Sequence, residues 1–234
     1  MLIIGHRGAA GVAKENTLES LQAGLDAEAD ILEFDVHTTK DNHPILVHDG
    51  NLRRTHKTRV SVGQSTLNQL QKVADKTDYP IATLEEVLDS FFGKIILNIE
   101  LKQRDCAKHV VKLLKKKYIK KPSDWNLVVF SSFYTSELKT VRKLSQDANL
   151  WLLHNRNPFI FIAYARRLGL NGVGFHRLYV NDFALEIAKK TDLFTYAYTV
   201  NRPHSAYLLS RKGIDGVVTD RPSTILTEIN RRQA

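Results

Sequence analysis

The feature that most constrains the fold is the order of elements: short β-rich runs alternate with helical patterns from one end of the chain to the other. The helical stretches, such as TLESLQAGLDA and CAKHVVKLLKKKY, carry apolar residues three and four positions apart, which is the period of an amphipathic helix. Eight strand-then-helix units can be counted, and the eighth ends in RPSTILTEINRRQ. The expected strands are residues 2–5, 31–36, 94–101, 126–131, 149–154, 171–176, 193–200 and 215–220.

Eight such units in 234 residues predict an α/β protein with a closed (β/α)8 TIM barrel. A doubly wound open sheet is the main alternative, because a strand count from sequence can be wrong by one. Residues 44–80 do not follow the repeat, since an extra strand-like PILVHD precedes a polar, weakly periodic stretch. We therefore expect a small insertion there, between strand 2 and helix 2. No linker divides the chain, which predicts one domain over residues 1–234.

Two helix starts have the spacing of a capping box, in which a side chain satisfies free backbone N–H groups of the first turn. Asn16 stands three residues before Glu19, and Thr83 stands three residues before Glu86. We expect Asn16 and Thr83 to cap the helices that follow them.

Lysine and arginine number 34 against 25 aspartates and glutamates, so the net charge is +9. This balance favours anionic partners, such as phosphate substrates, nucleic acid or an acidic membrane surface. The single cysteine, Cys106, excludes an intrachain disulfide. The first ten residues do not form a signal peptide and no segment approaches the ~20 apolar residues of a membrane span. We expect a soluble, cytoplasmic protein.

A basic run, KLLKKKYIKK at 112–121, lies at the C-terminal end of a predicted helix, where the helix dipole favours cations. We interpret it as a solvated face with at most a weak attraction to anionic membrane surfaces. No nucleic-acid motif or basic groove interleaved with aromatic residues is found in the sequence, so no nucleic-acid partner is expected. The oligomeric state is left open.

The strand ILEFDV (31–36) carries two carboxylates where a buried strand would have apolar residues. Side chains two positions apart point the same way, so Glu33 and Asp35 share one face with Ile31. Like charges this close raise each other's pKa unless a positive group neutralises them. A solvated edge strand would also tolerate the pair, but the second strand of a closed barrel has no edge.

Further polar residues follow the other strands, at the barrel end where active sites are built. His6 and Arg7 follow the first strand, and His48 ends the inserted PILVHD. Glu100 and Lys102 share one face of the strand around NIELK; a plain ion pair between them is the alternative. These residues, with Glu33 and Asp35, form the candidate site.

Each residue type in this set suits one part of a phosphate reaction. Three carboxylates without a nearby cysteine favour a hard divalent cation, Mg²⁺ or Ca²⁺, over zinc. Arg7 and Lys102 suit a phosphate group. His6 and His48 can serve as general acid and general base, since a free histidine titrates near neutral pH. The combination predicts metal-assisted hydrolysis of a phosphate ester.

The ordered motifs HRG, ENTLES, EADILEFDV, TKDNHPILVHD, LRRT and LNIELK resemble the glycerophosphodiester phosphodiesterase family. IATLEEVL, VVFSSF, YTVN and GIDGVVTDRP extend the resemblance over nearly the whole chain. The resemblance implies a TIM barrel that hydrolyses glycerophosphodiesters to sn-glycerol 3-phosphate and an alcohol. It also implies one divalent cation, with Mn²⁺ as an option beside Mg²⁺ and Ca²⁺.

By motif, the resemblance makes His6 and His48 the acid/base pair, Glu33, Asp35 and Glu100 the metal ligands, and Arg7 and Lys102 phosphate contacts. Tyr198 stands where the family usually has tryptophan, so it is expected to form an aromatic wall for the glycerol moiety. Which histidine is the acid, whether water or the glycerol hydroxyl attacks, and which diester is preferred are left open.

Two other functions stay in view. One is lysophospholipase D-type hydrolysis of lipid-bearing diesters. The other is a non-catalytic protein that binds phosphate ligands or lipid surfaces, although such a protein need not keep both histidines and all three carboxylates.

Overall fold

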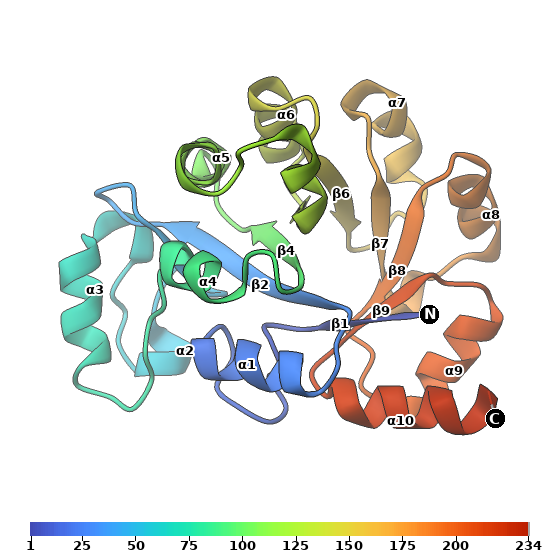
Figure 1. Ribbon diagram of the computed structural model, residues 1–234, viewed down its shortest axis with the longest axis horizontal. Coiled ribbons are helices and arrows are strands. Elements are labelled where there is room, and N and C mark those ends of the chain that lie inside the picture. Colours follow the sequence, from blue (N-terminus) through green and yellow to red (C-terminus); the bar gives the residue numbers. More distant parts are fainter. Residues whose placement is uncertain (234) are drawn as a thin grey trace.

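Eight parallel strands close into a barrel in the computed structural model, which describes residues 1–233 (Figure 1). Closure is made by β1, which pairs with β9 on one side and with β2 on the other. Each barrel strand therefore has a barrel strand on both sides, and the TIM-barrel prediction is confirmed. The barrel strands are β1 Leu2–Gly5, β2 Ile31–Thr38, β4 Ile96–Leu101, β5 Val128–Ser132, β6 Asn149–His154, β7 Gly172–His176, β8 Phe194–Tyr198 and β9 Gly216–Thr219.

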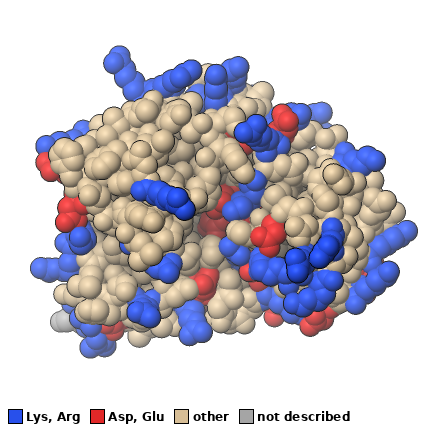
Figure 2. All heavy atoms as spheres, turned by 180° about the vertical axis from the view of Figure 1, so that it is seen from behind, with Lys and Arg blue, Asp and Glu red and all other residues tan. Residues whose placement is uncertain are grey.

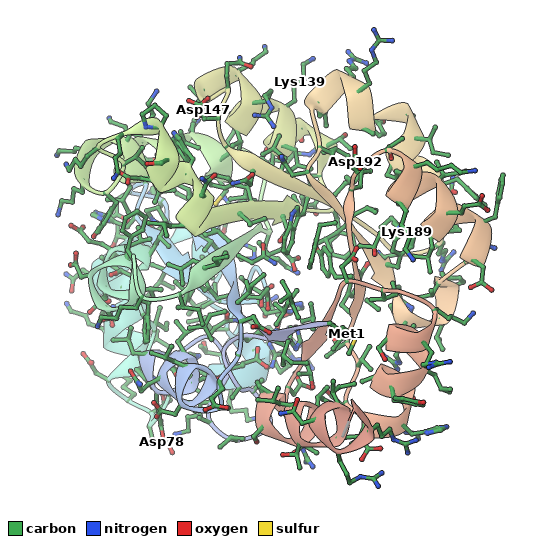
Figure 3. The ribbon with its side chains drawn as sticks, turned by 45° about the vertical axis from the view of Figure 1, so that its right-hand side comes forward. Met1, Asp78, Lys139, Asp147, Lys189 and Asp192 are labelled. Carbon is green, nitrogen blue, oxygen red and sulfur yellow. The ribbon has the colours of Figure 1, made fainter. Side chains whose placement is uncertain are left out.

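Helices cover the outside of the barrel, and side chains fill the space between them and the strands (Figures 1 and 3). In Figure 3 the labelled Asp78 and Lys139 lie at the periphery. The covering helices are α1 Leu18–Asp26, α4 Leu84–Phe91, α5 Cys106–Lys117, α6 Thr135–Leu144, α7 Ala165–Leu168, α8 Asp182–Lys190, α9 Pro203–Arg211 and α10 Pro222–Gln233. Short 3-10 turns η2 Pro122–Leu127, η3 Ile160–Ala163 and η4 Arg177–Tyr179 stand among them.

The alternation of side chains along β2 separates two layers of the core. Leu32, Phe34 and Val36 are fully buried in the layer between strands and helices. Ile31 belongs instead to a smaller cluster inside the barrel, with Ile4, Val129, Trp151, Leu153, Tyr196 and Val218. The face that carries Glu33 and Asp35 therefore looks into the barrel, as the period of two predicts.

The insertion between β2 and α4 has the expected place and its own small core. β3 (Pro44–Leu46) runs antiparallel to the end of β2, with Val36 opposite Leu46. Ile45, Leu52, Val62, Leu70 and Ile81 are buried against one another there. The other elements of the insertion are α2 Arg53–His56, η1 Val62–Gln64 and α3 Leu67–Ala74, seen at one side of the barrel in Figure 1. Only the first three residues of PILVHD are a strand, so His48 lies in the loop that follows.

One of the two expected helix caps is wrong. Thr83 and Glu86 form the predicted capping box at α4. At α1 the cap is Thr17, whose side chain accepts a hydrogen bond from the backbone of Ser20. Asn16 adopts a left-handed backbone conformation, with φ of 58°, and its amide turns to Asp35 instead. A buried carboxylate partner outcompetes the helix end for this side chain.

Candidate active site

The structure brings the three predicted metal ligands together. Glu33 and Asp35 lie on β2, and Glu100 stands directly beside Asp35 on the neighbouring strand β4. One carboxylate oxygen from each lies within 4.8 Å of the others. Glu33 and Asp35 are only 3% and 1% exposed. Two adjacent parallel strands with inward carboxylates in register therefore concentrate negative charge at the carboxyl end of the barrel.

The two predicted phosphate-binding cations lie against this cluster. Lys102 Nζ is 2.7 Å from an oxygen of Glu100 and 3.3 Å from an oxygen of Asp35. Arg7 Nε is 3.0 Å from the other oxygen of Asp35, and the backbone N–H of Arg7 donates to Glu33 at 2.9 Å. Three carboxylates thus face two side-chain cations.

The pKa values of the three carboxylates are shifted in different directions. Burial raises the pKa of Glu33, and the charge on Asp35 adds to the effect. The pKa of Glu100 is raised for the same two reasons, against the pull of Lys102. Burial would also raise the pKa of Asp35, but Lys102 and Arg7 outweigh it and hold that pKa well below its usual range. The cluster therefore has more carboxylates than its own cations neutralise.

This cluster fits a divalent cation. Glu33 Oε1 is buried without a hydrogen-bond partner among the described residues, and so is the side-chain oxygen of Asn98, its neighbour across the β2–β4 pair. Buried acceptors left without a donor are costly, and a cation satisfies them. The donors are all hard oxygens, which suit Mg²⁺, Ca²⁺ or Mn²⁺.

His6 is held by a carboxylate from the far end of the chain. Its Nδ1 lies 2.5 Å from Oδ1 of Asp220, which follows β9. Asn201 donates to the other oxygen of Asp220 and accepts from its backbone N–H, which fixes the carboxylate. Burial would lower the pKa of His6, but the hydrogen bond to Asp220 and the charge on Glu33 raise it overall.

His48 has a similar arrangement from the insertion. Its Nδ1 lies 2.7 Å from Oδ1 of Asp49, whose other oxygen accepts a hydrogen bond from Arg54 Nε at 2.8 Å. Burial lowers the pKa of His48, although the nearby charge on Asp35 opposes the change. The two histidines thus share a carboxylate partner at Nδ1 and differ in the direction of their pKa shifts.

A continuous chain of hydrogen bonds and ion pairs connects His48, through Asp49, to Arg7. Arg54 donates to both oxygens of Glu15, and Arg7 donates to the same carboxylate at 2.8 Å. Glu15 thereby links the insertion, which carries Arg54 and Asp49, to the loop after β1.

Tyr198 lies at the end of β8, where its hydroxyl donates to the backbone oxygen of His154. Its ring centroid is 5.9 Å from that of Phe133 and 5.9 Å from that of His176, edge-on to both. Lys102 Nζ is 5.8 Å from the Phe133 ring. Tyr198, Phe133 and His176 thus form an aromatic group on one side of the charged cluster. The sequence predicts that Tyr198 forms an aromatic wall for the glycerol moiety.

The sequence interpretation missed several polar residues of the site. Asp220 ends the run DGVVTD directly after a strand, so its position alone could have placed it at the barrel mouth. Asn16 has the spacing of a helix cap, Glu15 lies in the loop after β1, and Arg54 lies in the short helix α2; no local pattern predicts that these residues meet at the site. On the face in Figure 2, acidic and basic side chains meet in a central hollow, while lysines and arginines are spread over the rest.

Known proteins resemble the chain over nearly its full length. Residues 6–224 match the model of the glycerophosphoryl diester phosphodiesterase family. A glycerophosphodiester phosphodiesterase of Caldanaerobacter subterraneus is 27% identical, with 98% of each chain covered. An Oleispira antarctica phosphodiesterase solved with the product sn-glycerol-3-phosphate is 25% identical with a TM-score of 0.86, covering 98% of this chain and 97% of that one.

A second solved structure, the glycerophosphodiester phosphodiesterase of Thermotoga maritima, is 26% identical with a TM-score of 0.83 and 97% of each chain covered. The family match spans the site as well as the barrel, since it begins at His6 and includes Asp220. The chain belongs to the glycerophosphoryl diester phosphodiesterase family.

Proposed function

We propose that the protein hydrolyses glycerophosphodiesters to sn-glycerol 3-phosphate and an alcohol, with a divalent cation at Glu33, Asp35 and Glu100. The observation that carries this proposal is the carboxylate cluster beside two histidines that are each anchored by a further carboxylate. The product bound to the Oleispira antarctica relative supports the choice of substrate.

The charge at the site suits a phosphodiester. A divalent cation bound by the three carboxylates would supply positive charge to a phosphoryl oxygen. Arg7 and Lys102 lie against the same carboxylates and bring two more positive charges to the position of the phosphate. The net charge of the five side chains is negative, and a bound divalent cation would make the net charge of the group positive. A positive group attracts a singly charged diester.

The histidines then exchange protons with the substrate. Asp220 and Asp49 occupy the Nδ1 atoms of His6 and His48, so Nε2 is the nitrogen left on each ring for this exchange. The raised pKa of His6 favours it as the donor to the leaving alcohol. The lowered pKa of His48 favours it as the acceptor of the proton from the attacking group, which is water or the glycerol hydroxyl of the substrate. Such a pair contributes about 10²- to 10⁴-fold per proton transfer.

A second candidate is hydrolysis of diesters whose alcohol carries an acyl chain. A groove of about 570 Å³ beside the site favours it, because Leu178, Leu208 and Leu209 line it together with Arg177 and Arg202. Asn201, which holds Asp220, lines the same groove. An acyl chain placed there would lie next to the histidine end of the site.

The test is release of glycerol 3-phosphate from glycerophosphoethanolamine and from a lysophospholipid, with Mg²⁺, Mn²⁺ and Ca²⁺ supplied separately. We expect release from the water-soluble diester that EDTA abolishes and that His6→Ala reduces by at least about 10²-fold. Glu186→Gln, on the exposed face of α8, is the matched control and should leave the rate unchanged. No release with any of the three cations would refute the proposal, and faster turnover of the lysophospholipid would favour the second candidate.

A further inference from the structure

Four large apolar side chains lie exposed in the connections that follow β6 and β7 and in the first turn of α8. Leu178 is 72% exposed, Phe183 63%, Tyr179 42% and Phe159 36%. We call these four residues the apolar rim. Phe159 lies in the connection after β6 and Phe183 in the first turn of α8, yet their ring centroids are 6.1 Å apart. Large exposed apolar side chains gathered at one end of a barrel indicate a surface that contacts something else.

The apolar rim lies at the active-site end of the barrel. Both connections follow the carboxyl ends of parallel strands, as do the loops that carry His6 and Asp220. Leu178 lines the groove that also includes Asn201, the residue that holds Asp220. In Figure 1 the rim elements, between β6 and α8, lie across the barrel from the insertion.

Three arginines lie near the apolar rim: Arg177 and Arg202 line the same groove as Leu178, and Arg156 stands three residues before Phe159. Arg156, Arg177 and Arg202 are exposed and have no carboxylate within ion-pair distance among residues 1–233. The nearest acid in sequence, Asp182, is already paired with Lys212 at 2.8 Å. The rim thus combines exposed apolar and aromatic side chains with unpaired arginines, on a chain whose net charge is +9.

We propose that the apolar rim and its arginines dock the protein on an anionic lipid surface, with the barrel mouth turned toward the lipid. Apolar and aromatic side chains insert at the boundary of the headgroups, and nearby arginines are attracted to anionic headgroups. A second copy of the chain fits less well, because a symmetric contact would place the same arginines against one another. No described helix is long and apolar enough to cross a bilayer.

The lysine run at the end of α5 does not explain such docking. Each covering helix runs back from the carboxyl ends of the strands, so α5 ends at the opposite end of the barrel. Lys112 and Lys116 on this helix are exposed, so replacing both removes two positive charges away from the rim and serves as the control for replacing two arginines. Leu144, at the end of α6, is 41% exposed and provides the apolar control.

Co-sedimentation with vesicles tests the proposal and needs no turnover, so its outcome is separate from that of the hydrolysis assay. The full chain should bind vesicles of phosphatidylcholine containing phosphatidylglycerol more tightly than pure phosphatidylcholine vesicles, and added salt should weaken binding. Leu178→Ser with Phe183→Ser should reduce binding by about tenfold or more, because two apolar side chains no longer enter the lipid. Arg156→Gln with Arg202→Gln should abolish the preference for phosphatidylglycerol.

Leu144→Ser and the pair Lys112→Gln with Lys116→Gln should bind vesicles as the unchanged protein does. All these positions are exposed, so circular dichroism should report the same fold in every variant. The proposal is overturned if the unchanged protein ignores phosphatidylglycerol vesicles or if the α5 variants lose as much binding as the arginine variants. It is also overturned if the rim variants alter self-association in ultracentrifugation and leave vesicle binding intact.

Discussion

Asp220 Oδ1 lies 2.5 Å from Nδ1 of His6, although 214 positions separate the two residues in the chain. The contact exists because β1 and β9 pair and close the barrel, with Gly5 opposite Thr219. The last strand thus orients a side chain delivered by the first. Closure of the barrel therefore places Asp220 beside His6.

Replacing the carboxylate of Asp220 should change the pH dependence of the reaction. Asp220 raises the pKa of His6, so Asp220→Asn should lower that pKa and move the limb of the pH–rate profile that His6 controls to lower pH. We expect kcat to fall by about ten- to a hundredfold, because the ring also loses its fixed orientation. Steady-state kinetics across the pH range measures both effects.

Asp49→Asn is the matched change at His48. It should move the other limb, because a different histidine is affected. Identical profiles for the two variants would mean that the carboxylates do not act through separate histidines.

Glu15 should matter although it touches neither a histidine nor a proposed metal ligand. Its carboxylate joins Arg7 to Arg54, which in turn holds Asp49. Glu15→Gln keeps the shape and removes the charge, so Arg7 loses a partner and the phosphate position loosens. We expect KM to rise about tenfold or more, as for a loss of roughly 1.4 kcal/mol in binding.

A double-mutant cycle distinguishes the network from a local effect of Glu15. The loss of binding free energy in the Glu15→Gln, Arg54→Ala double variant should be smaller than the sum of the losses in the two single variants, since both changes interrupt one chain of ion pairs. Full additivity would argue that the link between the insertion and Arg7 has no role.

The fold was largely predictable because its signal repeats. The strand-then-helix pattern recurs eight times along the chain. Errors of up to two residues in the predicted ends of β4, β5 and β8 therefore do not alter the topology. The faces of β2 were predictable for the same reason, and they place Glu33 and Asp35 inside the barrel. The residues that hold the two histidines were harder to predict. Asp220 and Asn201 reach His6 only through closure of the barrel, and Arg54 reaches Glu15 only through the fold of the insertion.

Asn16 shows why a local motif can mislead. Its side chain has the spacing of a helix cap, but it donates to Asp35 Oδ2 at 2.9 Å and accepts from the Asp35 backbone at 3.0 Å. Asn16→Ala should destabilise the protein by about 3 kcal/mol, from two lost buried hydrogen bonds and a strained positive φ. Asn16→Gly loses the same hydrogen bonds without the strain, so it should be more stable than the alanine variant by ~1 kcal/mol.

Denaturant unfolding of the two variants measures this difference. Both should also bind a divalent cation more weakly than the unchanged protein, which calorimetry checks. Equal stability of the alanine and glycine variants would contradict the assigned strain, and unchanged cation affinity would contradict a role of Asn16 in fixing Asp35.

His154 should make the fold sensitive to acid. The ring is 5% exposed, both nitrogens are without hydrogen-bond partners among the described residues, and burial lowers its pKa to about 4 from an ordinary value of 6.5. Between these pH values the unfolded chain binds the proton and the folded chain does not. Stability is therefore complete above about pH 6.5 and falls by up to about 3 kcal/mol as the pH drops toward 4.

His154→Phe removes this proton site and keeps a ring edge-on to Phe175, 5.0 Å away between centroids. Urea unfolding should give similar stabilities for the two proteins at pH 8 and a shallower loss for the variant between pH 6.5 and 4. Parallel curves in that range would show that His154 is not responsible.

The central claim is that Glu33, Asp35 and Glu100 hold a divalent cation in front of His6 and His48. Anomalous diffraction from crystals soaked in Mn²⁺ tests it most directly, because the signal locates the ion without reference to activity. The account predicts one strong peak within about 2.0–2.6 Å of oxygens from all three carboxylates, on the side that the two histidines face. A fully loaded crystal with no peak there, or with its only strong peak elsewhere, would contradict it.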